Sequence, residues 1–316
     1  MKLAFASLVG IERMPFADLL PRAAVIRVDG IEVNCGPTYP PVGDGAEGGH
    51  LDLRSIVADG PAPTSETLRR HGLEITALAP MLNLLTLDRE ERRKRVAYFR
   101  LTLEACQALG VDTAVTYGGS PFGMHLWGMP GLPADHPTNR VRETVAIFQD
   151  VVGPLVEEAE HRGVKIALET APRGGGHGNV AHAPALWDLL FDAVPSPALG
   201  LSFDPSHLVW LQIGDIPAVL REYAPRIHHV DGKDAEILPA VLRRQGILGS
   251  GWWRYRLPGL GRIDWAQILS TLHEIGYAGA LGIENEDPVL PGLQGVRWSV
   301  SYLHGLGLLK EGGGEP

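Results

Sequence analysis

The stretch Leu199-Gly-Leu-Ser-Phe-Asp-Pro-Ser-His-Leu-Val-Trp210 is the best guide to the fold of this chain. Its first five residues predict a buried strand, which stops at Asp204-Pro-Ser-His207 before residues of helical period. A carboxylate and an imidazole at the mouth of a buried strand are costly without a partner, commonly a metal ion or a bound polar ligand. The same letters also fit a helix start, with Asp204 as the N-cap and Pro205 at the first helical position. On this stretch alone both interpretations stay open.

Short apolar segments alternate with longer segments of helical period, which is typical of βα units around a parallel sheet. Eight strands with intervening helices predict an α/β protein with a (β/α)8 TIM barrel, whose active site lies at the carboxyl ends of the strands. A doubly wound open sheet is the weaker alternative, because no GxGxxG follows the first strand. The predicted strands are Lys2–Ser7, Gly30–Asn34, Leu73–Leu78, Asp112–Tyr117, Val164–Glu169, Leu199–Phe203, Arg226–Asp231 and Ala278–Glu284.

Helices and loops between these strands have recognisable boundaries. Two long loops rich in Gly and Pro, residues 36–49 and 118–137, would rise from the carboxyl face, either as lids over a site or as tolerated surface insertions. The run Gly174-Gly-Gly176 lacks the Lys-Ser/Thr ending of a phosphate loop and predicts a flexible loop. The predicted helices are Leu87–Leu109, Thr138–Arg162, Ile263–Gly276 and Gly295–Leu309.

The composition is that of an ordinary globular protein. Of the 316 residues, 45% are hydrophobic and 21% charged, and the formal net charge of −9 disfavours nucleic acid as a partner. Cys35 and Cys106 have no zinc-like spacing, which indicates two plain thiols in a reducing compartment. No apolar run is long enough to span a bilayer, so we expect a cytoplasmic protein without a membrane partner. We expect a single domain over residues 1–310 and a flexible tail over residues 311–316.

Acidic and imidazole side chains end four consecutive predicted strands. Because side chains alternate along a strand, those two residues apart share one face. Converging carboxylates repel one another unless a cation lies between them, and oxygen-rich ligands with one or two imidazoles suit Mn²⁺ or Mg²⁺, with Co²⁺ as a further candidate. A ring of helix caps and surface ion pairs is the alternative. The residues at these four ends are Glu169, then Asp204 and His207, then His229, Asp231 and Lys233, and then Glu284 and Glu286.

Seven short motifs in fixed order extend this pattern over nearly the whole chain. They are Ala167-Leu-Glu169, Phe203-Asp-Pro-Ser-His207, His229-Val-Asp-Gly-Lys-Asp234, Trp252-Trp-Arg-Tyr-Arg-Leu-Pro-Gly-Leu-Gly261, Ile263-Asp-Trp265, Ile283-Glu-Asn-Glu-Asp-Pro288 and Pro291-Gly-Leu-Gln-Gly-Val296. Together they resemble the xylose isomerase-like TIM barrels, in particular the sugar phosphate isomerase/epimerase group with its ketose 3-epimerases and inosose dehydratase-like proteins. The resemblance implies one divalent metal, usually manganese, held by Glu169, Asp204, a residue of the seventh strand and Glu284, with the two glutamates also acting as base and acid.

Position 231 departs from the family pattern, which commonly has a second histidine in an HxHxKD run where this chain has Asp231. The segment Pro80-Met-Leu-Asn83 also lacks the histidine often seen after the third strand. Asp231 as the ligand would give an all-carboxylate site that favours Mg²⁺ or Mn²⁺. In a second alternative, His229 or His207 is the metal ligand instead of Asp231. In a third alternative, the pocket binds a sugar without a metal.

The arrangement suits an isomerase or epimerase of a sugar, sugar acid or cyclitol, working by proton abstraction next to a carbonyl through a metal-bound enediolate. Glu169 would remove the proton and Glu284 return it, or the reverse, according to the stereochemistry of the substrate. Dehydration of a keto-polyol of the inosose type on the same site is one alternative, and a non-catalytic sugar-binding protein is another. Association of outer helices into a homodimer stays open. The predicted substrate-binding residues are His207, His229, Lys233, Arg256 and Glu32.

Overall fold

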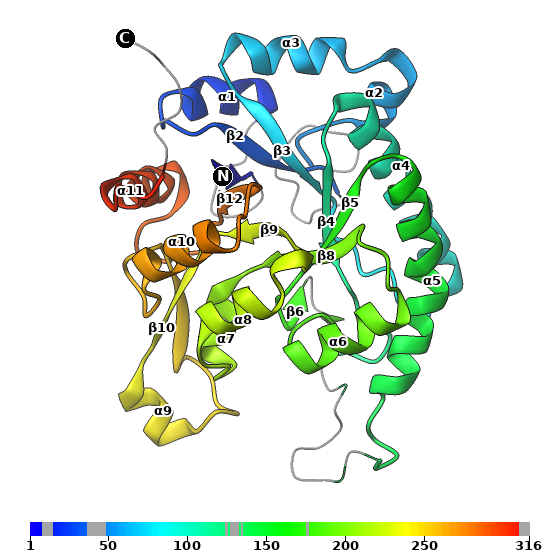
Figure 1. Cartoon of the computed structure of the whole chain (residues 1–316), viewed down its shortest axis with the longest axis vertical. Helices are drawn as coiled ribbons and strands as arrows, with labels where there is room; N and C mark the ends of the chain where they lie inside the picture. Colours follow the sequence, from blue (N-terminus) through cyan, green and yellow to red (C-terminus); the bar gives the residue numbers. More distant parts are fainter. Residues whose placement is uncertain are drawn as a thin grey trace.

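Eight parallel strands close into a barrel at the centre of the computed structural model (Figure 1). Neighbouring strands pair in the order β1-β12-β9-β8-β5-β4-β3-β2, and β2 pairs with β1 to close the ring. This confirms the predicted (β/α)8 TIM barrel. The barrel strands are β1 (Lys2–Ala6), β2 (Gly30–Asn34), β3 (Glu74–Ala79), β4 (Thr113–Tyr117), β5 (Lys165–Glu169), β8 (Leu199–Phe203), β9 (Ile227–Asp231) and β12 (Ala280–Ile283).

The structure describes residues 1–7, 15–36, 49–123, 126, 133, 135–174 and 177–309. The predicted tail 311–316, most of the predicted loop 36–49 and part of the loop 118–137 lie outside the described residues. Gly174 belongs to the short strand β6 (Arg173–Gly174), which pairs with β7 (His177–Gly178), whereas Gly175 and Gly176 are not among the described residues. Within the described part of the chain, no helix is both long enough and apolar enough to cross a membrane.

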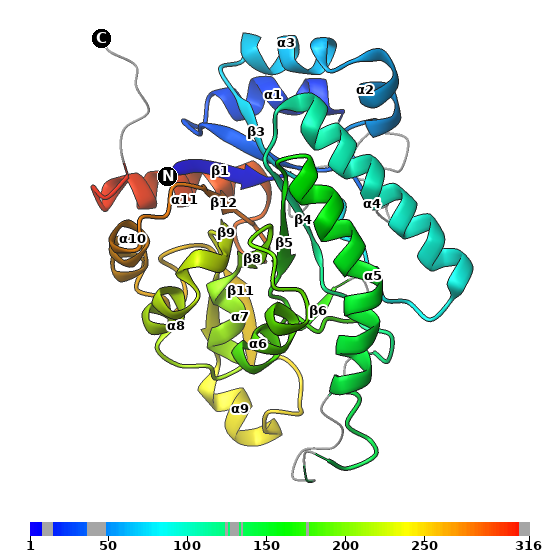
Figure 2. The same cartoon turned by 45° about the vertical axis from the view of Figure 1, so that its right-hand side comes forward.

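Helices surround the barrel (Figures 1 and 2). Asp88 begins α4 by accepting hydrogen bonds from two backbone N–H groups, and Gly110 ends that helix with a φ of 71°. The last helix runs over Gly292–Gly305 rather than from Gly295 to Leu309, since Gly307 turns the chain away with a φ of 68°. The helices are α1 (Phe16–Ala24), α2 (Leu53–Asp59), α3 (Ala62–Arg70), α4 (Arg89–Leu109), α5 (Val141–His161), α6 (Pro184–Ala193), α7 (Pro205–Trp210), α8 (Ile216–Glu222), α9 (Pro239–Gln245), α10 (Trp265–Glu274) and α11 (Gly292–Gly305), with a 3-10 turn at Ala224–Arg226.

The apolar core has an outer and an inner part. Large buried residues that alternate along the strands, such as Phe5, Leu201 and Phe203, pack with the helices in one extensive cluster. The barrel interior holds a separate cluster of small side chains, namely Ala77, Ala79, Val115 and Ala167. Because these inner residues are small, polar side chains at the strand ends can fold into the barrel without clashing.

An antiparallel hairpin follows β9 and packs against α7 (Figure 2). It pairs β10 (Asp234–Ile237) with β11 (Trp253–Arg256), and neither is among the predicted strands. Asp234 anchors its base by accepting a hydrogen bond of 3.1 Å from the indole N–H of Trp265. Trp253 stacks on Trp210 of α7 with ring centroids 4.3 Å apart. The hairpin is therefore held beside the mouth of the barrel.

Candidate active site at the carboxyl end of the barrel

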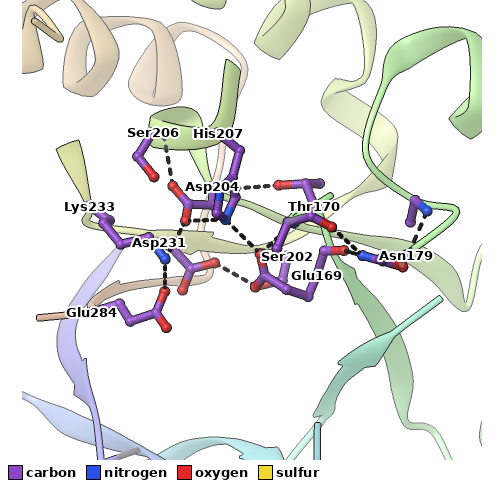
Figure 3. A network of polar contacts seen from close by, with 12 residues as sticks. Glu169, Thr170, Asn179, Ser202, Asp204, Ser206, His207, Asp231, Lys233 and Glu284 are labelled. Atoms are coloured by element: carbon purple, nitrogen blue, oxygen red, sulfur yellow. Dashed lines mark hydrogen bonds and ion pairs between the residues drawn. The ribbon is translucent and has the colours of Figure 1, made fainter. Parts of the chain in front are cut away.

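Four neighbouring strands bring acidic and basic side chains together inside the barrel, as the sequence predicts (Figure 3). All of these side chains are buried or nearly so, because the barrel wall surrounds them. They are Glu169 at the end of β5, Asp204 and His207 directly after β8, His229, Asp231 and Lys233 in and after β9, and Glu284 after β12.

The side chains of Glu169, Asp204 and His207 form one group of atoms close enough to hold a metal ion, which we call the mouth site. His207 Nε2 lies 2.9 Å from Asp204 Oδ2 and 3.5 Å from Glu169 Oε1. Within the described ranges, His207 Nε2 forms no hydrogen bond, and the partner of Asp204 Oδ2 on its other side is the Lys233 ammonium, 2.8 Å away. Two ligand atoms that each lie about 2.1 Å from one cation are about 3 Å apart, so this spacing fits two ligands of a shared ion.

Neighbouring charges shift the pKa values of two mouth-site residues, His207 and Asp204. Burial by itself opposes the charged form of His207, but Asp204 outweighs burial and raises the pKa of His207 to about 9. Burial would likewise raise the pKa of Asp204, but His207 and Lys233 together lower it well below its usual range. Asp204 is therefore a fully ionised carboxylate in the interior of the protein.

Lys233 is a buried cation among three carboxylates. Its Nζ lies 2.8 Å from Asp204 Oδ2, donates a hydrogen bond of 3.0 Å to Glu286 and donates another to Glu284. The ammonium also lies 4.6 Å from the centre of the Tyr255 ring. Burial opposes this charge, but Asp204 and Glu284 outweigh burial and raise the pKa of Lys233 well above its usual value.

A second group of possible metal ligands, which we call the deep site, consists of Glu32, His229 and Asp231. Glu32 and His229 lie in the middle of β2 and β9, and are therefore further inside the barrel than the residues at the strand ends. His229 Nε2 is 2.8 Å from Glu32 Oε2 and 3.8 Å from Asp231 Oδ1. Ser202 donates a hydrogen bond of 2.9 Å to Asp231 Oδ2. Burial, and then the surrounding carboxylates, raise the pKa of Asp231 well above its usual value.

The predicted ligand set of Glu169, Asp204, Asp231 and Glu284 is thus divided in the structure. Glu169 and Asp204 belong to the mouth site, Asp231 belongs to the deep site, and Glu284 belongs to neither group. Instead, Glu284 accepts a hydrogen bond from Lys233. Burial raises the pKa of Glu284 to about 8, although Lys233 opposes that shift.

Arg256, a predicted substrate contact, is hydrogen-bonded to two carboxylates that belong to neither the mouth site nor the deep site. Its Nε donates a hydrogen bond of 2.8 Å to Asp287, and its Nη1 donates one of 3.0 Å to Glu236. These contacts tie the hairpin to the segment after β12. A role for Arg256 in substrate binding stays a prediction.

Tyr255 reaches the site although it is not among the predicted site residues. Its hydroxyl lies 3.2 Å from His207 Nδ1, on the side of the ring away from the mouth site. Side chains alternate along β11, so Tyr255 and Trp253 lie on one face and Arg254 and Arg256 lie on the other. A strand prediction for residues 253–256 would therefore have placed Tyr255 on the same face as Trp253, which packs against α7.

Asn179 is a second residue of the site that no sequence motif predicts. Its side-chain amide donates hydrogen bonds of 2.6 Å to the carbonyl of Glu169 and 2.7 Å to that of Ala171. Only the fold brings this loop residue against the end of β5.

The chemistry of these residues fits a divalent cation. Carboxylates greatly outnumber basic groups, since the only basic side chains in the described cluster are Lys233, His207 and His229. The mouth site offers two carboxylates and one imidazole, a donor set that suits divalent metals of the first transition row. The carboxylates of the cluster are Glu32, Glu169, Asp204, Asp231, Glu284 and Glu286.

A model of the xylose isomerase-like TIM barrel family matches residues 23–306. The chain belongs to the xylose isomerase-like TIM barrel family. The chain is 28% identical to the uncharacterized protein YfiH of Bacillus subtilis, over 96% of its own length and 98% of that protein. It is 25% identical to an inosose dehydratase of Geobacillus kaustophilus, with 76% of each chain covered.

Solved structures share the fold at lower identity. A D-tagatose 3-epimerase-like protein superposes with a TM-score of 0.68 at 21% identity and 97% coverage of both chains. The IolI protein with a bound zinc atom superposes with a TM-score of 0.67 at 20% identity, covering 98% of this chain and 97% of that one. In the xylose isomerase-like barrel of the present chain, the imidazole beside Glu169 and Asp204 comes from His207 of α7 rather than from β9.

Proposed function

We propose that this chain is a divalent-metal-dependent isomerase or epimerase that moves a proton next to the carbonyl of a sugar, sugar acid or cyclitol. The observation that carries the proposal is the mouth site, where buried His207 Nε2 lies 2.9 Å from Asp204 Oδ2 and 3.5 Å from Glu169 Oε1 and forms no hydrogen bond with any described residue. The inosose dehydratase and the epimerase-like structure among its relatives support this class of small polyol substrate.

The residues that would hold the metal are Glu169, Asp204 and His207. A divalent ion, which we propose to be Mn²⁺, polarises a substrate carbonyl when it is bound and so lowers the pKa of the adjacent C–H group.

Glu169 is the proposed base. The backbone N–H of Ala171 donates a hydrogen bond of 3.0 Å to Glu169 Oε1, and Asn179 binds the carbonyl oxygen of the same residue. These contacts hold the carboxylate at the end of β5 in one orientation, which is what proton transfer to a fixed carbon requires. Glu169 takes the proton from the carbon beside the carbonyl.

Glu284 is the proposed acid, and Lys233 is its positioning residue. An ammonium has three N–H groups, and Lys233 contacts three carboxylates, those of Asp204, Glu284 and Glu286. Lys233 therefore holds Glu284 in place, and it can bind a substrate oxygen only when Glu286, the most exposed of the three, moves away. For epimerisation, Glu284 donates its own proton to the same carbon on the face opposite Glu169, and Glu169 keeps the proton that it removed.

Dehydration of a keto-polyol is the second candidate, supported by the inosose dehydratase relative. The same base would remove the same proton, and Glu284 would then protonate a departing β-hydroxyl. Both reactions begin with removal of the proton next to the carbonyl, so analysis of the product distinguishes them.

The test is deuterium exchange at the carbon next to the carbonyl, followed by proton NMR with Mn²⁺-loaded protein and a panel of ketoses, sugar acids and inososes. For a substrate that the wild type exchanges, we expect Glu169→Gln to lower the rate by roughly 10²- to 10⁴-fold. Glu157→Gln, at an exposed position of α5, is the matched control and should exchange like the wild type. Wild-type rates in Glu169→Gln, or no uptake of any divalent ion by the wild type, would show the proposal to be wrong.

A further inference from the structure

The deep site has the same unusual contact as the mouth site. Glu32 Oε2 and His229 Nε2 are 2.8 Å apart, yet neither atom forms a hydrogen bond with any residue in the part of the chain that the structure describes. Only 1% of the His229 side chain and 9% of the Glu32 side chain are exposed, so bulk water does not solvate these atoms. Two unbonded electron-pair donors at this distance fit a shared cation.

Residue 282 of β12, beside these two atoms, is a glycine, and the His229 imidazole packs directly against it. A Cβ at Gly282 would lie 2.9 Å from His229 Nε2 and 3.9 Å from Glu32 Oε2. Any larger residue would therefore push the His229 imidazole out of its place beside Glu32.

The barrel interior is also rich in carboxylates. Metal-bound histidines are neutral, so Lys233 is then the one protein cation of the described cluster among the six carboxylates named above. Carboxylates that converge in this way are stabilised by a cation between them.

We propose that Glu32, His229 and Asp231 bind a second divalent metal ion, deeper in the barrel than the mouth site. The donor set of two carboxylates and one imidazole suits Mn²⁺, Co²⁺ or Zn²⁺. Ser202 supports it by donating its hydroxyl hydrogen to Asp231 Oδ2, which leaves Oδ1 on the side of His229. This assignment also accounts for the carboxylate at position 231, because Asp231 would serve the deep site rather than the mouth site.

The experiment is a count of bound ions by elemental mass spectrometry, after removal of metal with a chelator and dialysis against Mn²⁺ or Zn²⁺. We expect two ions per chain in the wild type and one in Glu32→Gln, which keeps the shape of the side chain. Gly282→Ala should also bind one, because its methyl group displaces the His229 imidazole while every ligand residue remains. Glu169→Gln is the matched control, since it should lose the mouth-site ion and keep the deep one.

Anomalous diffraction from wild-type crystals soaked in Mn²⁺ or Zn²⁺ keeps the proposal testable if a variant does not fold. A peak between Glu32 and His229 supports the deep site. A peak only at the mouth site, or two ions per chain in folded Glu32→Gln, overturns it. A deep peak without a mouth-site peak overturns the proposed function and leaves the deep site standing.

Discussion

The backbone N–H of Ser206 donates a hydrogen bond of 2.8 Å to Oδ1 of Asp204, while Oδ2 of the same carboxylate lies 2.9 Å from His207 Nε2. One side chain thus caps α7 with one oxygen and faces the mouth site with the other. The two interpretations of the stretch 199–210, a helix cap and a site residue, describe different oxygens of one residue.

Because the two oxygens of Asp204 have different roles, two variants of this residue should differ in stability. Asp204→Asn keeps an N-cap side chain and loses the charge, whereas Asp204→Ala loses both. We expect both to lose Mn²⁺ at the mouth site in titration calorimetry. We expect Asp204→Ala to have a free energy of unfolding about 1 kcal/mol lower than Asp204→Asn in urea titrations without metal, because only Asn retains the cap. Equal stabilities, or wild-type Mn²⁺ affinity in Asp204→Asn, would contradict this assignment.

Lys233→Met should strongly destabilise the metal-free protein, because the substitution leaves buried Asp204 and Glu284 without their shared cation. The expected loss is about 3–5 kcal/mol in free energy of unfolding, measured by urea titration. Lys165→Met is the control, since Lys165 is half-exposed and lies 3.4 Å from Asp112, and it should cost less than about 1 kcal/mol. Mn²⁺ should restore part of the loss in Lys233→Met. A variant as stable as the wild type would refute the structural role of this ammonium.

Tyr255→Phe should weaken metal binding while leaving stability nearly unchanged. The substitution removes the hydroxyl that lies 3.2 Å from His207 Nδ1 but keeps the ring beneath Lys233. Groups that orient a metal-bound histidine typically contribute 10- to 100-fold in affinity, so we expect roughly a 10-fold weaker Mn²⁺ affinity in calorimetry. Tyr277→Phe is the matched control, because its hydroxyl binds the carbonyl of Ala280 at the start of β12. If both variants bind Mn²⁺ like the wild type, Tyr255 does not orient His207.

Buried His182 should account for part of the pH dependence of stability. Burial lowers the pKa of His182 below its ordinary value of 6.5, although its contact with the Asn179 carbonyl opposes the shift. In the unfolded chain His182 binds a proton near pH 6.5, whereas in the folded protein it stays neutral to a lower pH. The contribution of His182 to the free energy of unfolding is therefore complete above pH 6.5 and is lost as the pH falls below that value. The loss can reach about 1.4 kcal/mol per pH unit. Urea titrations at pH 7.5 and 5.5 should show a smaller difference in His182→Gln than in the wild type, and equal differences would show that His182 is not responsible.

Much of the fold follows from local patterns. The eight predicted strands agree with the barrel strands to within about two residues at their ends, because apolar runs, glycine stops and acidic caps such as Asp88 act over short stretches of chain. The acidic residues at the ends of four consecutive predicted strands also predicted that Glu169, Asp204, Asp231 and Glu284 would lie at the same end of the barrel.

The sequence by itself determined which elements form and which side chains enter the barrel, since both depend on residues close together in the chain. Only the tertiary structure decided how those side chains pair. It set Lys233 among three carboxylates, turned Arg256 toward Asp287, and divided the predicted ligands between the mouth site and the deep site. The physical reason is that pairing depends on the register between strands and on competition among buried charges, and both arise between residues that are far apart in the sequence.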